Sequence, residues 1–264
     1  HRHPKRIVVE LNEHHSTRLS EMHDVAVLPR PPKRSPIPID SPLDRVGTPY
    51  APADPARIAG VVRMNEPDGI HPARPPNETS RQIADHIVRF FAEEIRAGRL
   101  PAEFLPVQAG VGNVANAVLD GLGEHEEIPN FEMFTEVFQD SQIALMQEGK
   151  LTGASTTALT LSDEHMATLF DNMDFFARRI VIRPTEFSNN PGLIRRLGVV
   201  SINTVLEMDL VGCANSSHIC GTRLMNGVGG SGDFVRNAYL SILVAPSTAK
   251  DGDISTVVPL CTHV

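Results

Sequence analysis

The feature that most constrains the fold is an alternation of short apolar runs with amphipathic runs between residues 104 and 197. The short apolar runs are typical of buried strands, and the runs between them carry apolar residues at helical spacing. Repeated strand–helix alternation places the strands side by side in parallel, joined by crossover helices. The sequence therefore predicts an α/β fold, with an open, mainly parallel sheet covered by helices on both faces.

A long helix is expected before this alternation begins. Apolar residues recur there every four positions, at Ile83, Ile87, Phe91 and Ile95. Thr79 with Gln82 predicts a capping box at the start of the helix, and Gly98 supplies a stop at its end. The spacing predicts a helix with one buried face.

The expected strand–helix pairs are Phe104–Gln108 with Asn113–Leu122, Phe131–Thr135 with Ser141–Gln147, Leu159–Leu161 with Glu164–Asn172, and Arg179–Ile182 with Pro191–Leu197. Asn190 is the expected cap of the last helix, and Pro191 fits its first position. Further strands are expected at Val199–Asn203, Thr204–Leu210, Tyr239–Val244 and Ile254–Pro259.

Prolines concentrate in residues 29–56, which predicts an extended segment. Interleaved Val, Ile and Leu favour a segment strapped across a domain, while a disordered linker is the alternative. Lys5–Glu10 reads as a strand with nothing before it to pair with, and Ile254–Val264 is another strand-like run. We therefore expect a fragment of a longer chain, divided into residues 1–28, a connecting segment 29–73 and a main domain 74–264.

Composition narrows the class of protein. Apolar residues make up 41% and charged residues 21% of the 264, as is usual for a globular protein. The net charge of -8 argues against a nucleic-acid or anionic-membrane partner. No run approaches the ~20 apolar residues of a spanning helix, and the charged start is unlike a secretory signal. Cys213, Cys220 and Cys261 lack a C-x-x-C spacing, which predicts reduced thiols and a cytoplasmic location, or a mitochondrial one in a eukaryote.

The chemistry-bearing stretch is residues 105–140, where a glycine-rich turn opens a helix and Glu136 follows an apolar strand. Backbone N–H groups in such a turn hold an anion. A carboxylate beside them can attack an acyl group while the turn receives the developing negative charge. Glu132, Asp140 and the acidic run 124–127 are competing carboxylates. Only Glu136 lies just past a strand, where open α/β sheets bind ligands, so we predict that it is the nucleophile.

Two glycine patterns fit G-x-G-x-x-G/A, one from Gly110 to Ala115 and the other from Gly227 to Gly232. The first, with Glu132 about twenty residues on, matches the dinucleotide-binding fingerprint. Its position late in the chain and the Pro106 before it weigh against that interpretation. Plain tight turns, or backbone cradles for an acyl-CoA or its phosphates, are the alternatives. No G-x-S-x-G and no H-E-x-x-H is present, so neither a serine nucleophile nor a metal site is expected.

Five ordered runs carry a resemblance to a known family. They are GVGNVANAVL, FEMFTEVFQD, RPTEFSNNPGLIRRLGVVSINT, NSSHICGTRLMNGVGGSGDFVRNAYLSI and AKDGDISTVVPLCTHV. Together they resemble the acetyl-CoA hydrolase/transferase family, and within it the bacterial succinate- and acetate-type CoA-transferases. The resemblance implies a CoA-transferase-like fold of two related α/β domains with the active site between them. Residues 1–28 would then be a remnant of the first domain and residues 74–264 the second.

The resemblance also implies roles for single residues. Glu136, in T-E-V-F-Q-D, matches the nucleophile that forms a glutamyl-CoA thioester. Asn189, in the S-N-x-P run, matches an active-site asparagine, and the N–H of Gly230 matches an oxyanion donor. The CoA-binding turns would be made by Gly110, Val111, Gly112, Asn113, Gly227, Gly229 and Gly230.

Coenzyme A is thereby expected as a substrate, with no permanently bound cofactor and no metal. Acyl-CoA and small carboxylates are the expected partners, and a homodimer is expected for the full-length protein. An acetyl-CoA hydrolase, in which water replaces the second carboxylate, uses the same glutamate and stays an alternative. A CoA-binding fragment without turnover is the other alternative.

Overall fold

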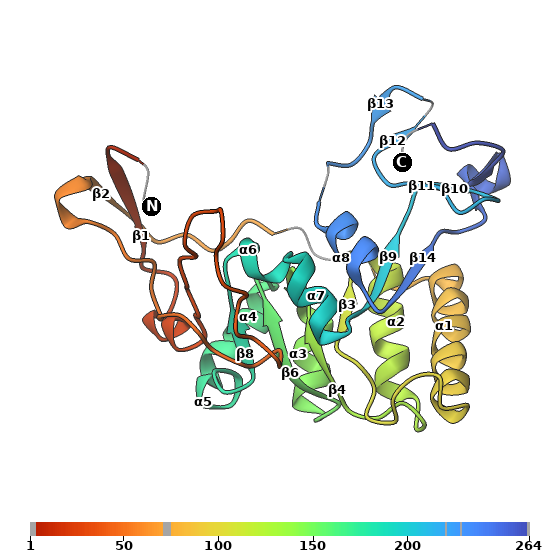
Figure 1. Ribbon diagram of the computed structural model, residues 1–264, viewed down its shortest axis with the longest axis horizontal. Helices are drawn as coiled ribbons and strands as arrows, with labels where there is room; N and C mark the ends of the chain where they lie inside the picture. The colour runs from red at the N-terminus through yellow and green to blue at the C-terminus, as the bar shows by residue number, and fades with distance from the viewer. Residues whose placement is uncertain (1–3, 71–74, 220, 228, 263–264) are drawn as a thin grey trace.

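The computed structural model describes residues 4–70, 75–219, 221–227 and 229–262. Within these residues a central sheet of six strands has the order β14-β9-β3-β4-β6-β8, and every neighbouring pair is parallel (Figure 1). Its strands are β3 Val107–Ala109, β4 Phe131–Phe134, β6 Leu151–Thr156, β8 Ile180–Ile182, β9 Val200–Thr204 and β14 Leu240–Val244. The α/β fold with a parallel sheet predicted from the sequence is confirmed.

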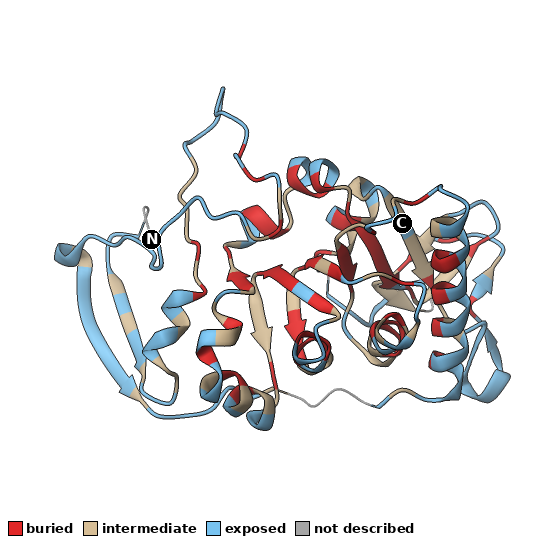
Figure 2. Cartoon of the chain, turned by 90° about the horizontal axis from the view of Figure 1, so that it is seen from below, coloured by how far each residue is buried: buried red, intermediate tan, exposed pale blue. Residues whose placement is uncertain are grey.

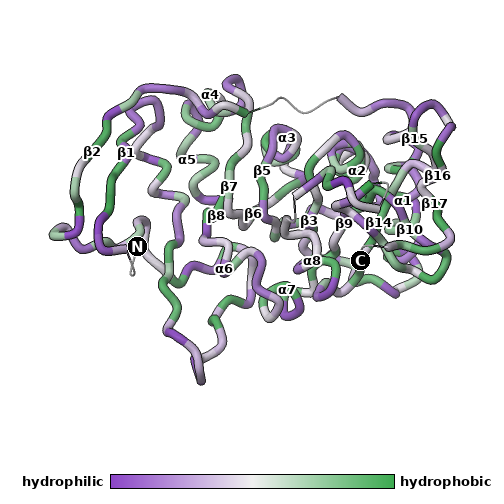
Figure 3. The backbone as a smooth tube through the Cα atoms, turned by 90° about the horizontal axis from the view of Figure 1, so that it is seen from above, coloured by the Kyte–Doolittle hydropathy of each residue, from purple (hydrophilic) through white to green (hydrophobic). Residues whose placement is uncertain are grey.

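Helices cover both faces of this sheet. They are α1 Glu78–Arg96, α2 Asn113–Glu124, α3 Asp140–Gln147, α4 Asp163–Asp171, α5 Met173–Phe176, α6 Thr185–Ser188, α7 Pro191–Leu197 and α8 Ser231–Asn237. Figure 3 shows α2, α3 and α4 on one side of the sheet and α6, α7 and α8 on the other. The chain changes side because it builds the sheet outward from β3 through β4, β6 and β8, and then returns to the other side of β3 with β9.

Two hydrophobic cores follow from these two layers. The larger lies between the sheet and the α1–α4 layer and includes Phe91, Leu119 and Met133. The smaller lies on the opposite face and joins Phe134, Phe187 and Phe234. Buried residues are concentrated in the sheet and the helix faces turned toward it (Figure 2). The central sheet is therefore buried on both faces, which fixes the positions of its strand ends and of the helices that follow them.

Smaller elements surround the sheet. They are β1 Ile7–Asn12, β2 Ile58–Met64, β5 Val137–Gln139, β7 Ala158–Thr160, β10 Glu207–Asp209, β11 Ala214–Asn215, β12 His218–Ile219, β13 Arg223–Leu224, β15 Thr248–Ala249, β16 Ile254–Ser255 and β17 Val257–Val258. Short 3-10 helices span Thr17–Glu21, Pro55–Arg57 and Lys250–Gly252. No described helix has the length and apolar character needed to span a bilayer.

The sequence suggested that the first strand has no partner, but the structure gives it one. β1 pairs in parallel with β2, and the two strands lie at one end of the molecule, away from the central sheet (Figure 1). Val8 and Leu11 are exposed there. The pairing could not be predicted from neighbouring residues, because the proline-rich segment separates β1 from β2 along the chain.

The start of α1 also differs from the expectation. Asn77, not Thr79, caps the helix, and the capping box is completed by Ser80 instead of Gln82. The Asn77 side chain accepts from Ser80 N at 2.9 Å, while Ser80 Oγ accepts from Asn77 N at 2.8 Å. Asparagine is at least as good a cap as threonine, so the helix begins two residues earlier. Gly98 has a φ of +68° and ends the helix as predicted.

The strap (residues 36–48) lies across the sheet instead of behaving as a linker. Ile37 and Ile39 are buried in the smaller core, and Leu43 packs on Gly153 in β6, where a Cβ would meet its Cδ1 at 2.6 Å. The interpretation of a strapped segment is therefore confirmed for these residues. It also explains why β6 escaped sequence analysis: the strand needs a small residue where the strap crosses.

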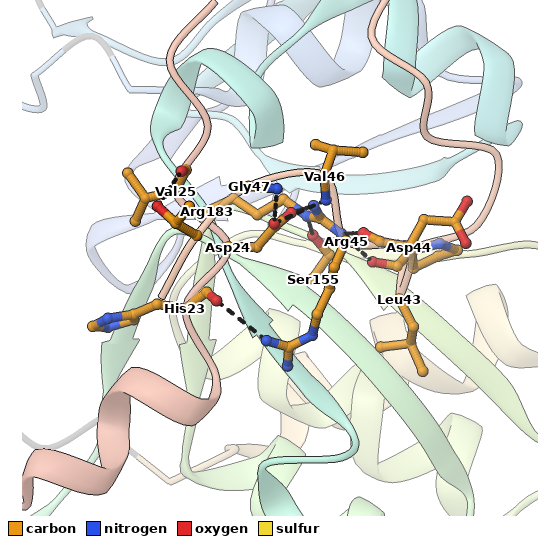
Figure 4. Close-up of polar contacts among 12 residues, drawn as sticks. His23, Asp24, Val25, Leu43, Asp44, Arg45, Val46, Gly47, Ser155 and Arg183 are labelled. Carbon is orange, nitrogen blue, oxygen red and sulfur yellow. Dashed lines mark hydrogen bonds and ion pairs between the residues drawn. The ribbon is translucent and has the colours of Figure 1, made fainter. Parts of the chain in front are cut away.

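A buried ion pair holds the strap in place (Figure 4). Arg183 pairs with Asp24, donates to Ser155 Oγ at 2.8 Å and donates to the carbonyl of Pro42 at 2.9 Å. The other oxygen of Asp24 accepts from the N–H groups of Val46 and Gly47. Burial lowers the pKa of Arg183, and the nearby Asp24 charge opposes that change. One arginine thus connects the sheet to the middle of the strap at Pro42 and, through Asp24, to Val46 and Gly47 near its end.

Candidate active site

Glu136 lies at the carboxyl end of β4, in the link between β4 and β5. Its backbone carbonyl accepts three hydrogen bonds, from Thr156 Oγ1 at 2.9 Å, Thr157 N at 3.0 Å and Ala158 N at 3.1 Å. A carbonyl so restrained fixes the backbone from which the side chain projects. The position of Glu136 is therefore set by the turn after β6, the next strand of the sheet.

Asn189 contacts the Glu136 carboxylate from the layer of helices formed by α6, α7 and α8. It follows α6, and its Nδ2 donates to Glu136 Oε2 at 3.0 Å. The neighbouring Asn190 is the residue that caps α7, accepting from Gly192 N and Leu193 N. The cap predicted at Asn190 is confirmed, which leaves the Asn189 side chain to contact the carboxylate.

Gly230 packs against both the Glu136 carboxylate and the Asn189 amide. A Cβ built on Gly230 would overlap Oε2 of Glu136 and Nδ2 of Asn189, and would lie 3.0 Å from Cδ of Glu136. Its φ of -76° is open to any residue, so close approach, and not backbone conformation, requires glycine here. The residue directly precedes α8. Three residues that the sequence spreads over 95 positions, from 136 to 230, therefore meet at one point.

The Gly110–Asn113 turn lies at the same edge of the sheet, at the end of β3. Gly110 N donates to Ile202 O at 2.9 Å, and Gly110 O accepts from Gln139 Nε2 at 3.4 Å. Gly112 has a φ of +124° and leads into α2 at Asn113, while Val111 is exposed. β3 and β9 flank the point where the strand order reverses, and open α/β sheets bind ligands in the crevice beside such a point.

A buried amide pair supports this turn from behind. Gln108 and Asn203 exchange two side-chain hydrogen bonds, at 3.2 and 2.8 Å. Asn203 Oδ1 would lie 3.3 Å from a Cβ on Gly110. Sequence analysis missed this pair, because the two residues are far apart along the chain. Polar residues inside otherwise apolar strands were the available signal.

Gly227 and Gly229 face a cavity beside α8. The cavity has a volume of about 580 Å³, and Ser217, His218 and Arg236 are among its other lining residues. Ser231 and Gly232 line it as well, whereas Gly230, just before them, contacts Glu136. Neither Glu136 nor Asn189 belongs to the described lining. Gly230 therefore contacts the Glu136 carboxylate, while its neighbours Gly229 and Ser231 line the cavity.

The carboxylates that competed with Glu136 lie elsewhere. Glu132 is on β4, and burial raises its pKa above the usual range. Asp140 starts α3, accepts from Ser162 N and lies near His165. Cys213 and Cys261 are free thiols, while Cys220 lies outside the described residues. Within the described residues no cluster of His, Cys, Asp and Glu side chains has the arrangement of a metal site.

Comparison with known proteins decides the family. The acetyl-CoA hydrolase/transferase C-terminal domain profile matches residues 166–264. The chain is 51% identical over 260 residues to the propanoyl-CoA:succinate CoA transferase of Escherichia coli, covering 98% of this chain and 53% of that protein. The chain belongs to the acetyl-CoA hydrolase/transferase family. The family predicted from the five runs is thereby confirmed.

Other members of the acetyl-CoA hydrolase/transferase family show the same coverage. The succinyl-CoA:acetate CoA-transferase of Clostridium kluyveri is 44% identical, over 98% of this chain and 48% of its own length. The acetyl-CoA hydrolase of Schizosaccharomyces pombe is 40% identical, over 98% and 50%. The chain spans about half the length of the curated relatives it matches.

Solved structures support the CoA-transferase-like fold. RipA from Yersinia pestis superposes with a TM-score of 0.62 at 26% identity, covering 78% of this chain and 45% of that one. A 4-hydroxybutyrate CoA-transferase from Porphyromonas gingivalis gives a TM-score of 0.60 at 19% identity, covering 98% and 54%. At that identity the second likeness shows the fold alone.

Proposed function

We propose that Glu136 is the nucleophile in a transfer of coenzyme A between an acyl-CoA and a small carboxylate. The observation that carries this proposal is the contact of Asn189 Nδ2 with Glu136 Oε2 at 3.0 Å, with Gly230 packed against the same carboxyl group. The names of two relatives as CoA-transferases support it. Because the chain spans half of those relatives, the activity is proposed for the protein encoded by the complete reading frame.

In the proposed mechanism, one oxygen of Glu136 attacks the thioester carbonyl carbon of the acyl-CoA. The tetrahedral intermediate collapses, the C–S bond breaks, and CoA leaves as a thiolate with an acyl-glutamyl anhydride behind it. The thiolate then attacks Cδ of Glu136, which gives the glutamyl-CoA thioester and releases the first carboxylate. A second carboxylate runs these steps in reverse and leaves as the new acyl-CoA.

The neighbours of Glu136 fit the charges that develop in this sequence. Each attack places negative charge on a carbonyl oxygen, and preorganised N–H donors stabilise it. The Gly230 N–H, the Asn189 amide and the turn around Gly112 are the proposed donors. Removal of one such donor lowers the rate by about 100-fold to 1,000-fold in comparable sites.

We further propose that the cavity lined by Gly227 and Gly229 holds part of the coenzyme A. Its volume of about 580 Å³ lies within the range of small-molecule sites. The Gly110–Asn113 turn is proposed as a second contact for the substrate. Residues 74–264, which contain all these groups, are proposed to form one domain, with residues 29–73 as its connection to residues 1–28.

Hydrolysis of acetyl-CoA is the second candidate. It is favoured by the acetyl-CoA hydrolases among the relatives, at 40% and 41% identity. The same glutamyl intermediate serves both reactions, because water can take the place of the second carboxylate. Turnover of acyl-CoA with and without added acetate separates them: a transferase needs the acetate, and a hydrolase does not.

The nucleophile is tested by trapping the intermediate. The protein encoded by the complete reading frame is incubated with acyl-CoA and its mass is measured. We expect the added mass of CoA less one water, on a peptide containing Glu136. Glu136→Gln should remove this adduct, and Glu132→Gln, a matched change four residues away, should retain it. An adduct that survives in Glu136→Gln contradicts the assignment. CoA binding without any adduct in the wild type indicates a binding protein instead of an enzyme.

A further inference from the structure

We propose that the hydroxyl groups of Thr157 and Ser188 form a positioning relay that fixes the orientation of the Asn189 amide, an inference that rests on the proposed function of Glu136. Neither residue touches the Glu136 carboxylate in the structure. Their effect is exerted through Asn189, whose amide has one end that donates and one that accepts.

The relay is a continuous line of hydrogen bonds. Thr157 Oγ1 lies 2.5 Å from Ser188 Oγ, and Ser188 Oγ donates to Asn189 Oδ1 at 2.7 Å. Asn189 Nδ2 then donates to Glu136 Oε2 at 3.0 Å. Ser188 is fully buried, so water does not compete for its hydroxyl. The line therefore runs from the turn after β6, through the end of α6, to the carboxylate.

Counting protons gives the line a single direction. A serine or threonine hydroxyl has one proton to donate, and an amide oxygen can only accept. The proton of Ser188 is used on Asn189 Oδ1, so Thr157 must donate to Ser188. With its oxygen held by Ser188, the Asn189 amide presents its nitrogen to Glu136. A flipped amide would place two acceptors, Oδ1 and the carboxylate, against each other.

The same turn holds the nucleophile itself. Thr157 donates its backbone N–H to the carbonyl of Glu136 at 3.0 Å, and Thr156 adds a side-chain hydrogen bond to that carbonyl. Thr157 thus restrains Glu136 by its backbone and Asn189 by its side chain. The separation of the amide and the carboxylate is set by one short segment.

The relay matters most after Glu136 has reacted. While Glu136 is a carboxylate, its negative charge alone attracts Nδ2, and such charge-assisted hydrogen bonds are the strong ones. In the glutamyl-CoA thioester that charge is gone, and the neutral acyl group is a weaker acceptor. Ser188 then keeps the amide nitrogen directed at the thioester carbonyl oxygen, which gains negative charge when the second carboxylate attacks the carbon beside it. Loss of the relay should slow discharge of the thioester more than its formation.

The test compares these two half-reactions in the protein encoded by the complete reading frame. Adduct formation is timed after mixing with acetyl-CoA, and adduct discharge is timed after removal of CoA and addition of acetate. Ser188→Ala and Thr157→Val should each slow discharge about tenfold, as expected for one lost hydrogen bond. Formation should change by less than about threefold. Thr157→Ser retains a hydroxyl and should discharge at the wild-type rate.

Two further variants control for packing and for independence. Ser201→Ala removes an equally buried hydroxyl, bonded to Ser241 Oγ at 3.3 Å on β9, and should leave both rates unchanged. The double variant Ser188→Ala/Thr157→Val should be no slower than Ser188→Ala alone, because both changes break one line. Thermal unfolding of each variant reports whether the fold persists.

The outcomes separate this inference from the function on which it rests. A wild-type protein that forms no adduct overturns both. An adduct that forms normally and is discharged by Ser188→Ala at the wild-type rate overturns the relay and leaves the nucleophile intact. Equal slowing of both half-reactions also overturns it, since that result indicates a general distortion of the site. Should Ser188→Ala fail to fold, the contrast between Thr157→Val and Thr157→Ser decides.

Discussion

Gly230 lies so close to Glu136 that a single methyl group on it would overlap the carboxylate oxygen Oε2. The contact joins the start of α8 to the end of β4. It makes residue 230 a sensitive probe of the site, because the smallest possible enlargement already displaces the carboxylate or the Asn189 amide.

Gly230→Ala should therefore lower kcat/KM by at least about 100-fold, a loss of the size that follows removal of one oxyanion donor. The backbone conformation at this position suits alanine, so the fold should persist. Steady-state kinetics and thermal unfolding would be measured together. Gly60→Ala, where a Cβ meets nothing within 4 Å, is the matched control and should behave as wild type. Full activity in Gly230→Ala would be incompatible with the site as described.

The Gln108–Asn203 amide pair offers a prediction about stability. Asn203→Leu leaves the buried Gln108 amide without its partner, which should cost about 1–3 kcal/mol of unfolding free energy. Replacing both residues by leucine removes both polar groups and should recover part of that loss. Urea unfolding of the two single variants and the double variant measures the coupling. Strictly additive losses would show that the two amides do not depend on each other.

The Arg183–Asp24 pair should contribute far more than the surface ion pairs do. Asp24→Ala leaves a buried guanidinium unpaired and releases the N–H groups of Val46 and Gly47. Breaking a buried pair in this way costs about 3–5 kcal/mol. Arg96→Ala, which removes an exposed pair with Glu127, should leave the urea midpoint nearly unchanged. Similar midpoints for the two variants would contradict a special role for Arg183.

Glu132 gives stability a dependence on pH. Burial raises its pKa in the folded protein above the unfolded value, so the folded state binds the proton more tightly. Stability from this group is present below the unfolded pKa and is lost as pH rises through the folded pKa. Glu132→Gln should therefore stabilise the protein more at pH 7 than at pH 4. Urea unfolding at both values tests this, and an equal gain at the two would count against a half-buried Glu132 that is ionised at pH 7.

The sequence was sufficient where the controlling interactions are local. Asn190 and Pro191 indicate the start of α7 locally, as its cap and its first residue. In α1 the apolar residues that recur every four positions predict which face is buried. The strand β6 was missed because its sequence, LTGAST, has neither alternation nor an apolar run. Its small residues make sense only beside Leu43 of the strap, more than a hundred positions earlier.

The candidate site also contains residues that local sequence predicts and residues that it does not. Glu136 could be proposed from its place after a strand, whereas Asn189 and Gly230 came from resemblance to a family. Nothing local singles out Ser188 or Thr157, because hydroxyl residues before an asparagine or after a strand are common. Their significance depends on a contact between the turn after β6 and the end of α6, 31 residues apart. Such contacts follow from the sheet order, which strand prediction alone does not supply.

The burial of the strap determines what happens when the chain is cut just before it. Residues 29–36 are exposed, while Ile37 and Ile39 are buried on one side of them and Asp24 is buried on the other. A protease that cuts within residues 29–36 would separate two pieces that are each anchored to the sheet. The cut chain should therefore migrate as one particle in gel filtration and fall apart only in denaturant. In this region the fold depends on what the chain contacts and not on the peptide bonds that join it.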